Sequence, residues 1–173
     1  SSYSPNSPYS ASKASADMLV RSFNKTYGLN TSISISSNNY GPNQNNEKFI
    51  PKVINSLLNN NEITVYGDGL NVRDWIYVED HCMGIDMIFN NSESGSVYNI
   101  GGNNELTNIS LIEIIYNIIS GYKKVQKKID FVTDRYGHDR RYSLNTSLIE
   151  KEIGWNPKTN FKDGIKKLIK TML

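Results

Sequence analysis

Short apolar segments alternate with longer helical patterns along the chain, and this alternation restricts the fold more than any other feature. The segments that read as strands are residues 31–36, 63–66, 96–100 and 129–132. Strands that alternate with helices are typical of α/β proteins with a largely parallel sheet. We therefore expect an α/β fold.

Helix signals lie between these segments. Ser7 and Pro8 predict the start of a helix and Gly28 its end. Residues 47–59 carry an apolar stripe at helical spacing. The further helices we expect are 79–90, 110–120 (opened by a capping box of Ser110 and Glu113), 146–153 and 161–172, with 37–46 as a loop.

Composition excludes several functional classes. A net charge of +2 over 173 residues, with no basic stripe, argues against nucleic-acid binding. There is no apolar run of membrane length, so we expect no membrane partner. Cys82 is the single cysteine, and with no signal peptide at the start we expect a cytoplasmic protein. No cluster has metal-ligand spacing, so we expect no metal.

The chain begins at a helix and contains no Gly-x-Gly-x-x-Gly turn. A doubly wound nucleotide-binding fold normally carries that turn after its first strand. We therefore expect this sequence to be the C-terminal portion of a longer protein.

Tyr9 and Lys13 are four residues apart, which places both on one face of the first predicted helix. With 11 tyrosines and 14 lysines in the chain, one such match is expected about once by chance. The pair can form a base or be an ordinary exposed pair. Small Ser and Ala residues around it would let a ligand or another backbone approach closely.

Six motifs occur in order: "SPYSASKASAD", "SNNYGP", "EKFIP", "RDWIYVEDH", "YNIGG" and "GHDRRY". Together they resemble the nucleotide-sugar dehydratases of the extended short-chain dehydrogenase/reductase superfamily, most closely those that act on dTDP-glucose. The resemblance runs from Ser4 to Leu173.

The resemblance implies the C-terminal part of a Rossmann-like doubly wound parallel sheet plus a smaller α/β substrate-binding domain. Residues 1–46 and 78–101 would belong to the NAD-binding domain, and 47–77 and 102–173 to the sugar-nucleotide domain. It also implies NAD as cofactor, dTDP-glucose or a similar sugar nucleotide as substrate, and a homodimer built partly from the helix that starts at Pro8.

Tyr9 and Lys13 are catalytic and cofactor-binding by this resemblance, and Asn39 also contacts NAD. A free phenol is only about 0.1% ionised at pH 7, and a neighbouring ammonium favours its anion. Tyr9 would take the proton of the sugar 4-hydroxyl. Asn38 would contact substrate, although paired asparagines are also common turn formers.

The other substrate residues implied by the resemblance are Lys48, Phe49, Ile50, Pro51, Lys52, Val53, Thr64, Val65, Tyr66, Arg73, Asn108, Asp134, Arg135, Tyr136, Gly137 and His138. A nucleoside diphosphate favours the fixed fork of a guanidinium, and four of the five arginines lie at 73 or in 135–141. The alternatives are salt bridges from these arginines to Asp74 or Asp139, and plain core roles for the apolar members.

Two departures from the family pattern bear on the substrate. Residues 42–46 read "PNQNN", where the family often has aromatics and a histidine, and Tyr136 replaces a usual proline. The alternatives are therefore a UDP-glucose 4,6-dehydratase, a sugar-nucleotide 4-epimerase, and a non-catalytic sugar-nucleotide binding protein. By resemblance, the dehydratase's elimination residues lie upstream, so this chain alone is expected to be inactive.

Overall fold

The computed structural model describes residues 3–173. The helices in that range are α1 (Pro8–Tyr27), α2 (Phe49–Leu58), α3 (Val78–Asn91), α4 (Asn108–Ser120), α5 (Ser147–Ile153) and α6 (Phe161–Lys170). The strands are β1 (Ile33–Ser36), β2 (Asn38–Tyr40), β3 (Ile63–Tyr66), β4 (Val72–Tyr77), β5 (Val97–Ile100), β6 (Glu105–Thr107), β7 (Ile129–Val132) and β8 (Arg141–Tyr142).

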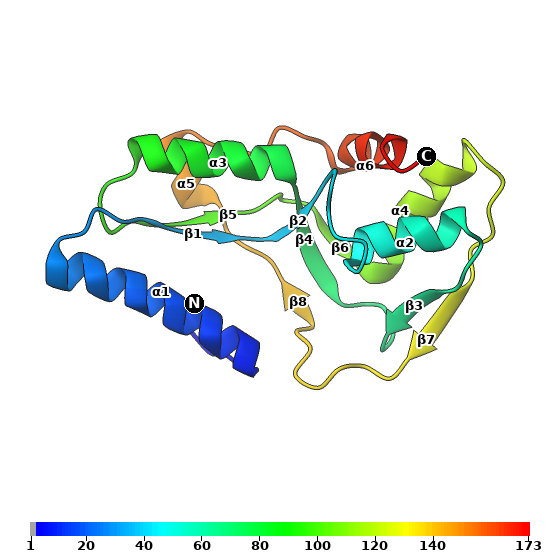
Figure 1. The fold of residues 1–173 in the computed structure, drawn as a ribbon, viewed down its shortest axis with the longest axis horizontal. Helices are drawn as coiled ribbons and strands as arrows, with labels where there is room; N and C mark the ends of the chain where they lie inside the picture. The colour runs from blue at the N-terminus through cyan, green and yellow to red at the C-terminus, as the bar shows by residue number, and fades with distance from the viewer. Residues whose placement is uncertain (1–2) are drawn as a thin grey trace.

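The strands pair mainly in parallel, which confirms the predicted α/β class. β1 pairs with β5, β3 pairs with β7, and β4 pairs with both β2 and β8, all in parallel. Only β6 runs antiparallel to its partner, β4. In Figure 1, the β1–β5 pair lies between α1 and α3, while α2, α4 and α6 gather with β3 and β7 at the other end of the molecule.

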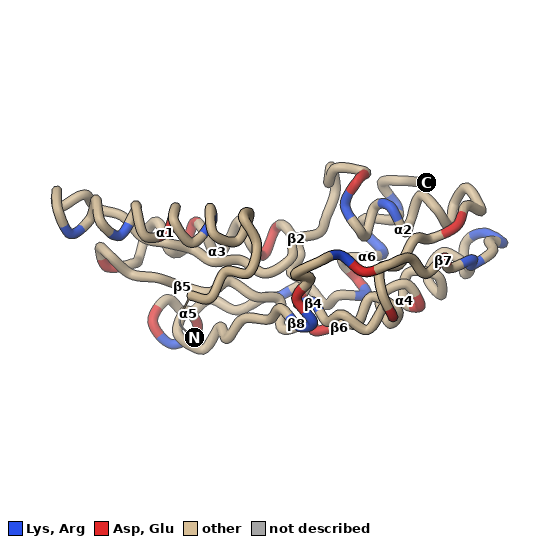
Figure 2. The backbone as a smooth tube through the Cα atoms, turned by 90° about the horizontal axis from the view of Figure 1, so that it is seen from below, with Lys and Arg blue, Asp and Glu red and all other residues tan. Residues whose placement is uncertain are grey.

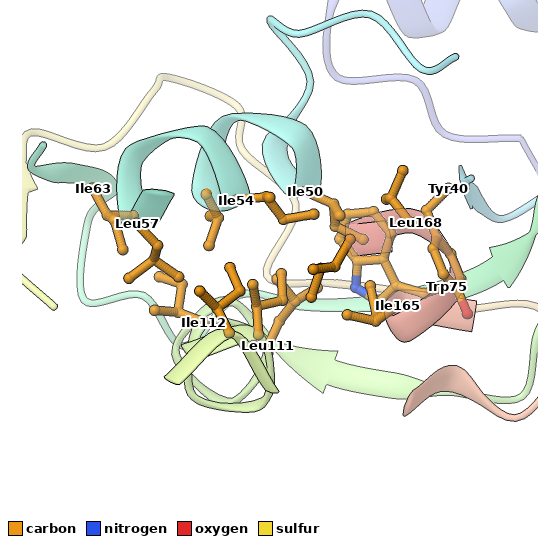
Figure 3. Close-up of a cluster of buried hydrophobic side chains, with 14 of the residues drawn as sticks. Tyr40, Ile50, Ile54, Leu57, Ile63, Trp75, Leu111, Ile112, Ile165 and Leu168 are labelled. Atoms are coloured by element: carbon orange, nitrogen blue, oxygen red, sulfur yellow. The ribbon is translucent and has the colours of Figure 1, made fainter. Parts of the chain in front are cut away.

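The larger core lies at the α2, α4 and α6 end (Figure 3). Ile54 and Leu57 of α2, Ile112 of α4 and Ile165 of α6 are all fully buried in it. Apolar residues three and four apart on each helix produce one continuous buried face, so the three helices stabilise one another.

A smaller core joins α3, β5 and α5. Its buried members are Ile76, Ile88, Tyr98, Ile100, Ile149 and Trp155. The indole Nε1–H of Trp155 donates to the Asp80 carbonyl oxygen at 3.1 Å, and the Asp80 carboxylate accepts from the Thr159 N–H at 2.8 Å. These bonds tie the chain after α5 to the start of α3, across the division that we predicted between the two domains.

The predicted boundaries of α1 are confirmed. The Ser7 hydroxyl accepts from the Ser10 N–H at 3.1 Å, and Pro8 occupies the first helical position. Gly28 ends the helix with φ 67°, a left-handed conformation that glycine adopts without steric cost.

Two local predictions are wrong. The segment 37–46 is not all loop, because residues 38–40 form β2 by pairing with β4. The helix α4 is capped by Thr107 rather than Ser110: the Thr107 hydroxyl accepts from the Ser110 N–H at 3.1 Å. Within residues 3–173, no helix combines the length and apolarity needed to cross a membrane.

Candidate functional site

Tyr9 and Lys13 lie on the uncovered part of α1. Tyr9 is 75% exposed and Lys13 is also exposed, and Ala14 is the one buried residue of this helix. Their four-residue spacing on a continuous helix sets the phenol and the ammonium on the same side. Both groups are therefore accessible to a ligand.

The strand β8 meets the end of β1 close to Tyr9. The Tyr142 hydroxyl donates to the Ser36 carbonyl oxygen at 3.1 Å. Burial raises the pKa of the Tyr142 phenol, with smaller contributions from the charges of Asp139, Tyr9 and Asp74. The fold thus brings "GHDRRY" beside the start of α1 (Figure 1).

Asn38 and Asn39 lie in β2, beside the carboxyl end of β1. The Asn39 side-chain N–H donates to the Ser37 carbonyl oxygen at 3.3 Å, and the Gln44 side-chain N–H donates to the Asn39 carbonyl oxygen at 2.9 Å. The carboxyl ends of parallel strands are where ligands bind in open α/β sheets. The roles of the two asparagines in binding substrate and cofactor stay predictions.

Arg73 of β4 is a half-buried cation. Burial lowers the pKa of its guanidinium, and the Asp139 carboxylate opposes that effect. Its Nη1 donates to the Val72 carbonyl oxygen at 2.7 Å. In the described part of the chain Arg73 has no salt bridge, so most of its N–H donors are available to an anion.

The segment 134–138 folds around the His138 ring. Its Nδ1 lies 2.7 Å from the Asp134 carboxylate and its Nε2 lies 3.0 Å from an N–H group of Arg135. A nitrogen that faces a guanidinium must accept, so Nδ1 carries the proton and donates to Asp134. This hydrogen bond is the main reason that the pKa of Asp134 lies below its usual range.

Tyr66 and Asn108 lie next to this segment. The Arg135 guanidinium lies 5.1 Å from the centre of the Tyr66 ring, at cation–π distance. The Asn108 N–H donates to the carbonyl oxygen of buried Asn71, whose own side-chain N–H donates to the Asp139 carbonyl oxygen. The fold therefore gathers Tyr66, Arg73, Asn108 and the 134–138 segment around one wall.

Arg140 and Arg141 do not join this wall. Arg140 pairs with Asp68 at 2.7 Å and Arg141 pairs with Glu105 at 2.6 Å. Figure 2 shows basic and acidic residues close together beside β4, β6 and β8. The alternative partners named from sequence, Asp74 and Asp139, form no salt bridge with an arginine in residues 3–173.

The apolar residues predicted to line the substrate pocket are mostly core residues. Ile50, Pro51, Val53 and Val65 are buried, whereas Phe49 and Thr64 are partly buried. The exposed members are Lys48, Lys52, Tyr66, Asp134, Arg135, Gly137 and fully exposed Tyr136. Of the residues predicted to line the substrate pocket, it is therefore mainly the polar and aromatic ones whose side chains a substrate can contact.

Sequence reasoning missed the residues that hold the wall in place. The fully buried Asp74 carboxylate accepts from the Gly102 and Asn104 N–H groups at 2.9 and 2.7 Å. Gly102 lies so close to β4 that a Cβ there would fall 1.8 Å from the Trp75 carbonyl oxygen. The Gly pair of "YNIGG" was the only sequence signal for this close approach.

Comparisons with known proteins identify the family of the chain. Residues 1–168 match the family model described as GDP-mannose 4,6 dehydratase. The chain belongs to this family. It is 44% identical over 175 residues to the dTDP-glucose 4,6-dehydratase of Escherichia coli, covering 99% of this chain and 48% of that relative. The chain thus spans about half the length of the curated relatives it matches.

Solved structures of the family superpose closely. The dTDP-glucose 4,6-dehydratase of Bacillus anthracis, in complex with NAD, is 47% identical with a TM-score of 0.90, covering 96% of this chain and 52% of that one. The UDP-glucose 4-epimerase of Thermotoga maritima is 27% identical with a TM-score of 0.88, covering 98% of this chain and 54% of that one. The predicted family and the α/β fold are confirmed.

The residues present fit a dinucleotide such as NAD. Tyr9 and Lys13 are open to solvent, and the buried Oδ1 of Asn39 has no hydrogen-bond partner in the described residues. An orphaned acceptor at a strand end is what a ligand N–H or hydroxyl would satisfy. Within residues 3–173, no group of three or more His, Cys, Asp and Glu residues is placed to hold a metal ion.

Proposed function

We propose that the native protein carrying this chain converts dTDP-glucose to dTDP-4-keto-6-deoxyglucose in an NAD-dependent 4,6-dehydration. The observation that carries the proposal is the open Tyr9 and Lys13 face of α1. The start of this helix lies beside the wall of Tyr66, Arg73, Asn108 and residues 134–138. The 47% identity to a dTDP-glucose 4,6-dehydratase, against 27% to a UDP-glucose 4-epimerase, supports this reaction over epimerisation.

Tyr9 acts as the base in the first step. Its phenolate takes the proton of the sugar 4-hydroxyl as the C4–H bond breaks, and the positive charge of Lys13 favours that phenolate. When bound, NAD supplies the reversible hydride acceptor that this oxidation and the later reduction at C6 require. The resulting C4 ketone acidifies the C5 proton, so that water can leave across C5 and C6.

The nucleotide is held by the wall that contains Arg73. A nucleoside diphosphate carries about two negative charges, and a half-buried guanidinium without a salt bridge is a strong, oriented donor to such a group. The Tyr66 ring and the Arg135 guanidinium provide a flat surface beside it. Asn38, Asn108, Lys48, Lys52 and the 134–138 segment are the further substrate contacts that we propose.

The domain division and the partners are part of the same proposal. Residues 1–46 and 78–101 form the NAD-binding part, and the remainder binds the sugar nucleotide. The exposed Met18, Leu19 and Phe23 of α1 support a homodimer contact on this helix. The free thiol of Cys82 suits a cytoplasmic location.

The test is to offer the native protein dTDP-glucose and UDP-glucose separately, with NAD, and to measure product mass. Loss of one water establishes the 4,6-dehydratase, and the faster substrate identifies the base. Conversion to the galactose isomer at unchanged mass would make the protein a 4-epimerase. Saturable binding without either change would favour a non-catalytic binding protein and reject the proposal.

A further inference from the structure

Two amide oxygens at the end of β2 are buried and unpaired. Among the described residues, Asn39 Oδ1 and Gln44 Oε1 have no hydrogen-bond partner. Both residues line the same cavity, with Gly41, Pro42 and Val78 as its apolar walls. A buried acceptor without a partner is costly, so a ligand in this cavity that brings N–H or O–H donors would satisfy both oxygens.

The orientation of both amides is fixed by their nitrogens. The Asn39 Nδ2 donates to the Ser37 carbonyl oxygen, and the Gln44 Nε2 donates to the Asn39 carbonyl oxygen. Rotating either amide by half a turn would set its oxygen against a carbonyl oxygen, where neither atom can donate. The hydrogen-bond network therefore leaves the oxygens as the groups available to a ligand.

The walls restrict what can approach these oxygens. A Cβ at Gly41 would lie 2.4 Å from Val78 Cγ1, so only glycine allows the backbone to pass this close to α3. The cavity is lined by the last residues of β2 and by the loop that follows, at the carboxyl end of a parallel strand, where ligands of open α/β sheets bind. A planar primary amide fits such a place, because its two N–H bonds lie in one plane and diverge toward two acceptors.

We propose that Gln44 is a further cofactor-binding residue, and that Gln44 and Asn39 together accept the two N–H bonds of the nicotinamide carboxamide. This inference rests on the proposed function, because it takes NAD as the cofactor. It gives a role to "PNQNN", the segment that departs from the family pattern. Gln44 supports Asn39 through its nitrogen and contacts the ligand through its oxygen.

The experiment compares three ligands by direct binding to the native protein. NAD carries the carboxamide, its nicotinic acid analogue carries a carboxylate with no N–H donor, and ADP-ribose lacks the ring. The variant is Gln44→Met, which keeps side-chain length without the amide. Gln126→Met is the matched control, because Gln126 is the other glutamine in the chain and is exposed.

We expect the unaltered protein to bind NAD about tenfold or more tightly than the carboxylate analogue. Gln44→Met should raise the dissociation constant of NAD about tenfold and so reduce the ratio of affinities for NAD and the nicotinic acid analogue. The dissociation constant of ADP-ribose should change by less than about twofold. Gln126→Met should leave all three dissociation constants unchanged.

Three results would overturn the inference. Equal weakening of NAD and ADP-ribose by Gln44→Met would show that Gln44 only supports the loop. If Gln44→Met leaves the NAD affinity unchanged, the side-chain oxygens do not accept hydrogen bonds from the carboxamide. Equal affinities of the unaltered protein for NAD and its analogue would show the same. Failure of the unaltered protein to bind NAD or ADP-ribose would instead reject the proposed function together with this inference.

Discussion

The helices α1 and α2 differ in what their residues contribute. α1 has 20 residues and buries only Ala14, whereas α2 has 10 residues and buries five of them. α1 begins at a side-chain cap from Ser7 and stops at Gly28, which has a left-handed backbone conformation. At the start of α2, by contrast, Lys48 provides no side-chain cap. Capping residues in the sequence set the ends of α1, whereas burial of its apolar side chains stabilises α2.

This difference in burial indicates which helix can contribute residues to binding. The residues of α2 are committed to the larger core, so their replacement is felt as lost stability. The residues of α1 contribute little to that core and remain available to a ligand or a second subunit. The first two of four predictions test this contrast and the other two extend it to charged residues of β4 and β6, in order from the largest expected effect to the smallest.

Tyr9→Phe should lower the turnover number of the native protein about a thousandfold, because the phenyl ring cannot take the proton of the substrate hydroxyl. The free energy of unfolding should change by less than about 0.5 kcal/mol, since Tyr9 is 75% exposed. The control is Tyr27→Phe, which removes a 69% exposed hydroxyl from the same helix. Equal turnover in both variants would show that Tyr9 is an ordinary surface residue.

Leu57→Ala should lower the free energy of unfolding by about 2–5 kcal/mol, because Leu57 is fully buried and its truncation leaves a cavity. Lys25→Ala, at an exposed residue of α1, should cost about 0.5 kcal/mol or less. Urea denaturation of both variants measures the difference. Similar losses would contradict the contrast between the two helices.

Arg73→Lys should weaken binding of the sugar nucleotide about 10- to 100-fold, because an ammonium cannot reproduce a forked contact with phosphate oxygens. Arg140→Lys should change it less than about threefold, because Arg140 already pairs with Asp68. Calorimetric titration with dTDP-glucose gives both dissociation constants. If the two substitutions weaken binding equally, general charge rather than Arg73 holds the nucleotide.

Glu105→Gln should make the protein slightly less sensitive to acid. Hydrogen bonds from Arg141 and Ser143 hold the pKa of Glu105 below its usual range, so the stability it adds is present above its unfolded pKa. That stability is lost as the pH falls through the lower pKa of the folded state. Between about pH 5 and pH 3, the melting temperature of the unaltered protein should fall more steeply than that of the variant. Parallel curves would show that the pair with Arg141 adds nothing measurable.

The sequence predicted the parts of the fold that depend on neighbouring residues. Ser7, Pro8 and Gly28 fixed the ends of α1, and apolar spacing located α2 and α6. It failed at β2, because "NNY" has weak strand preference and pairs with β4, more than thirty residues away in the chain. It also chose Ser110 over Thr107 as a cap, since Ser and Thr are both common caps and sequence alone does not say where the helix begins.

Motifs predict Tyr9, Lys13, Arg73 and the 134–138 segment as site residues, and the fold leaves them at the surface or along one wall. Their roles stay predictions. The departure at "PNQNN" marks the segment of Gln44, but the burial of its unpaired side-chain oxygen is a property of the folded chain and cannot be predicted from the sequence. The same holds for Asp74, whose backbone partners come from a loop 28 to 30 residues later.

The central claim is that Tyr9 starts an oxidation at C4 whose hydride returns to C6 of the same sugar. The most direct test uses dTDP-glucose with deuterium on C4, incubated with NAD and the native protein, with the label located in the product by NMR. The account predicts deuterium in the C6 methyl group of a product that has lost one water. Deuterium retained at C4 of an isomeric sugar, or an unchanged substrate, would contradict it.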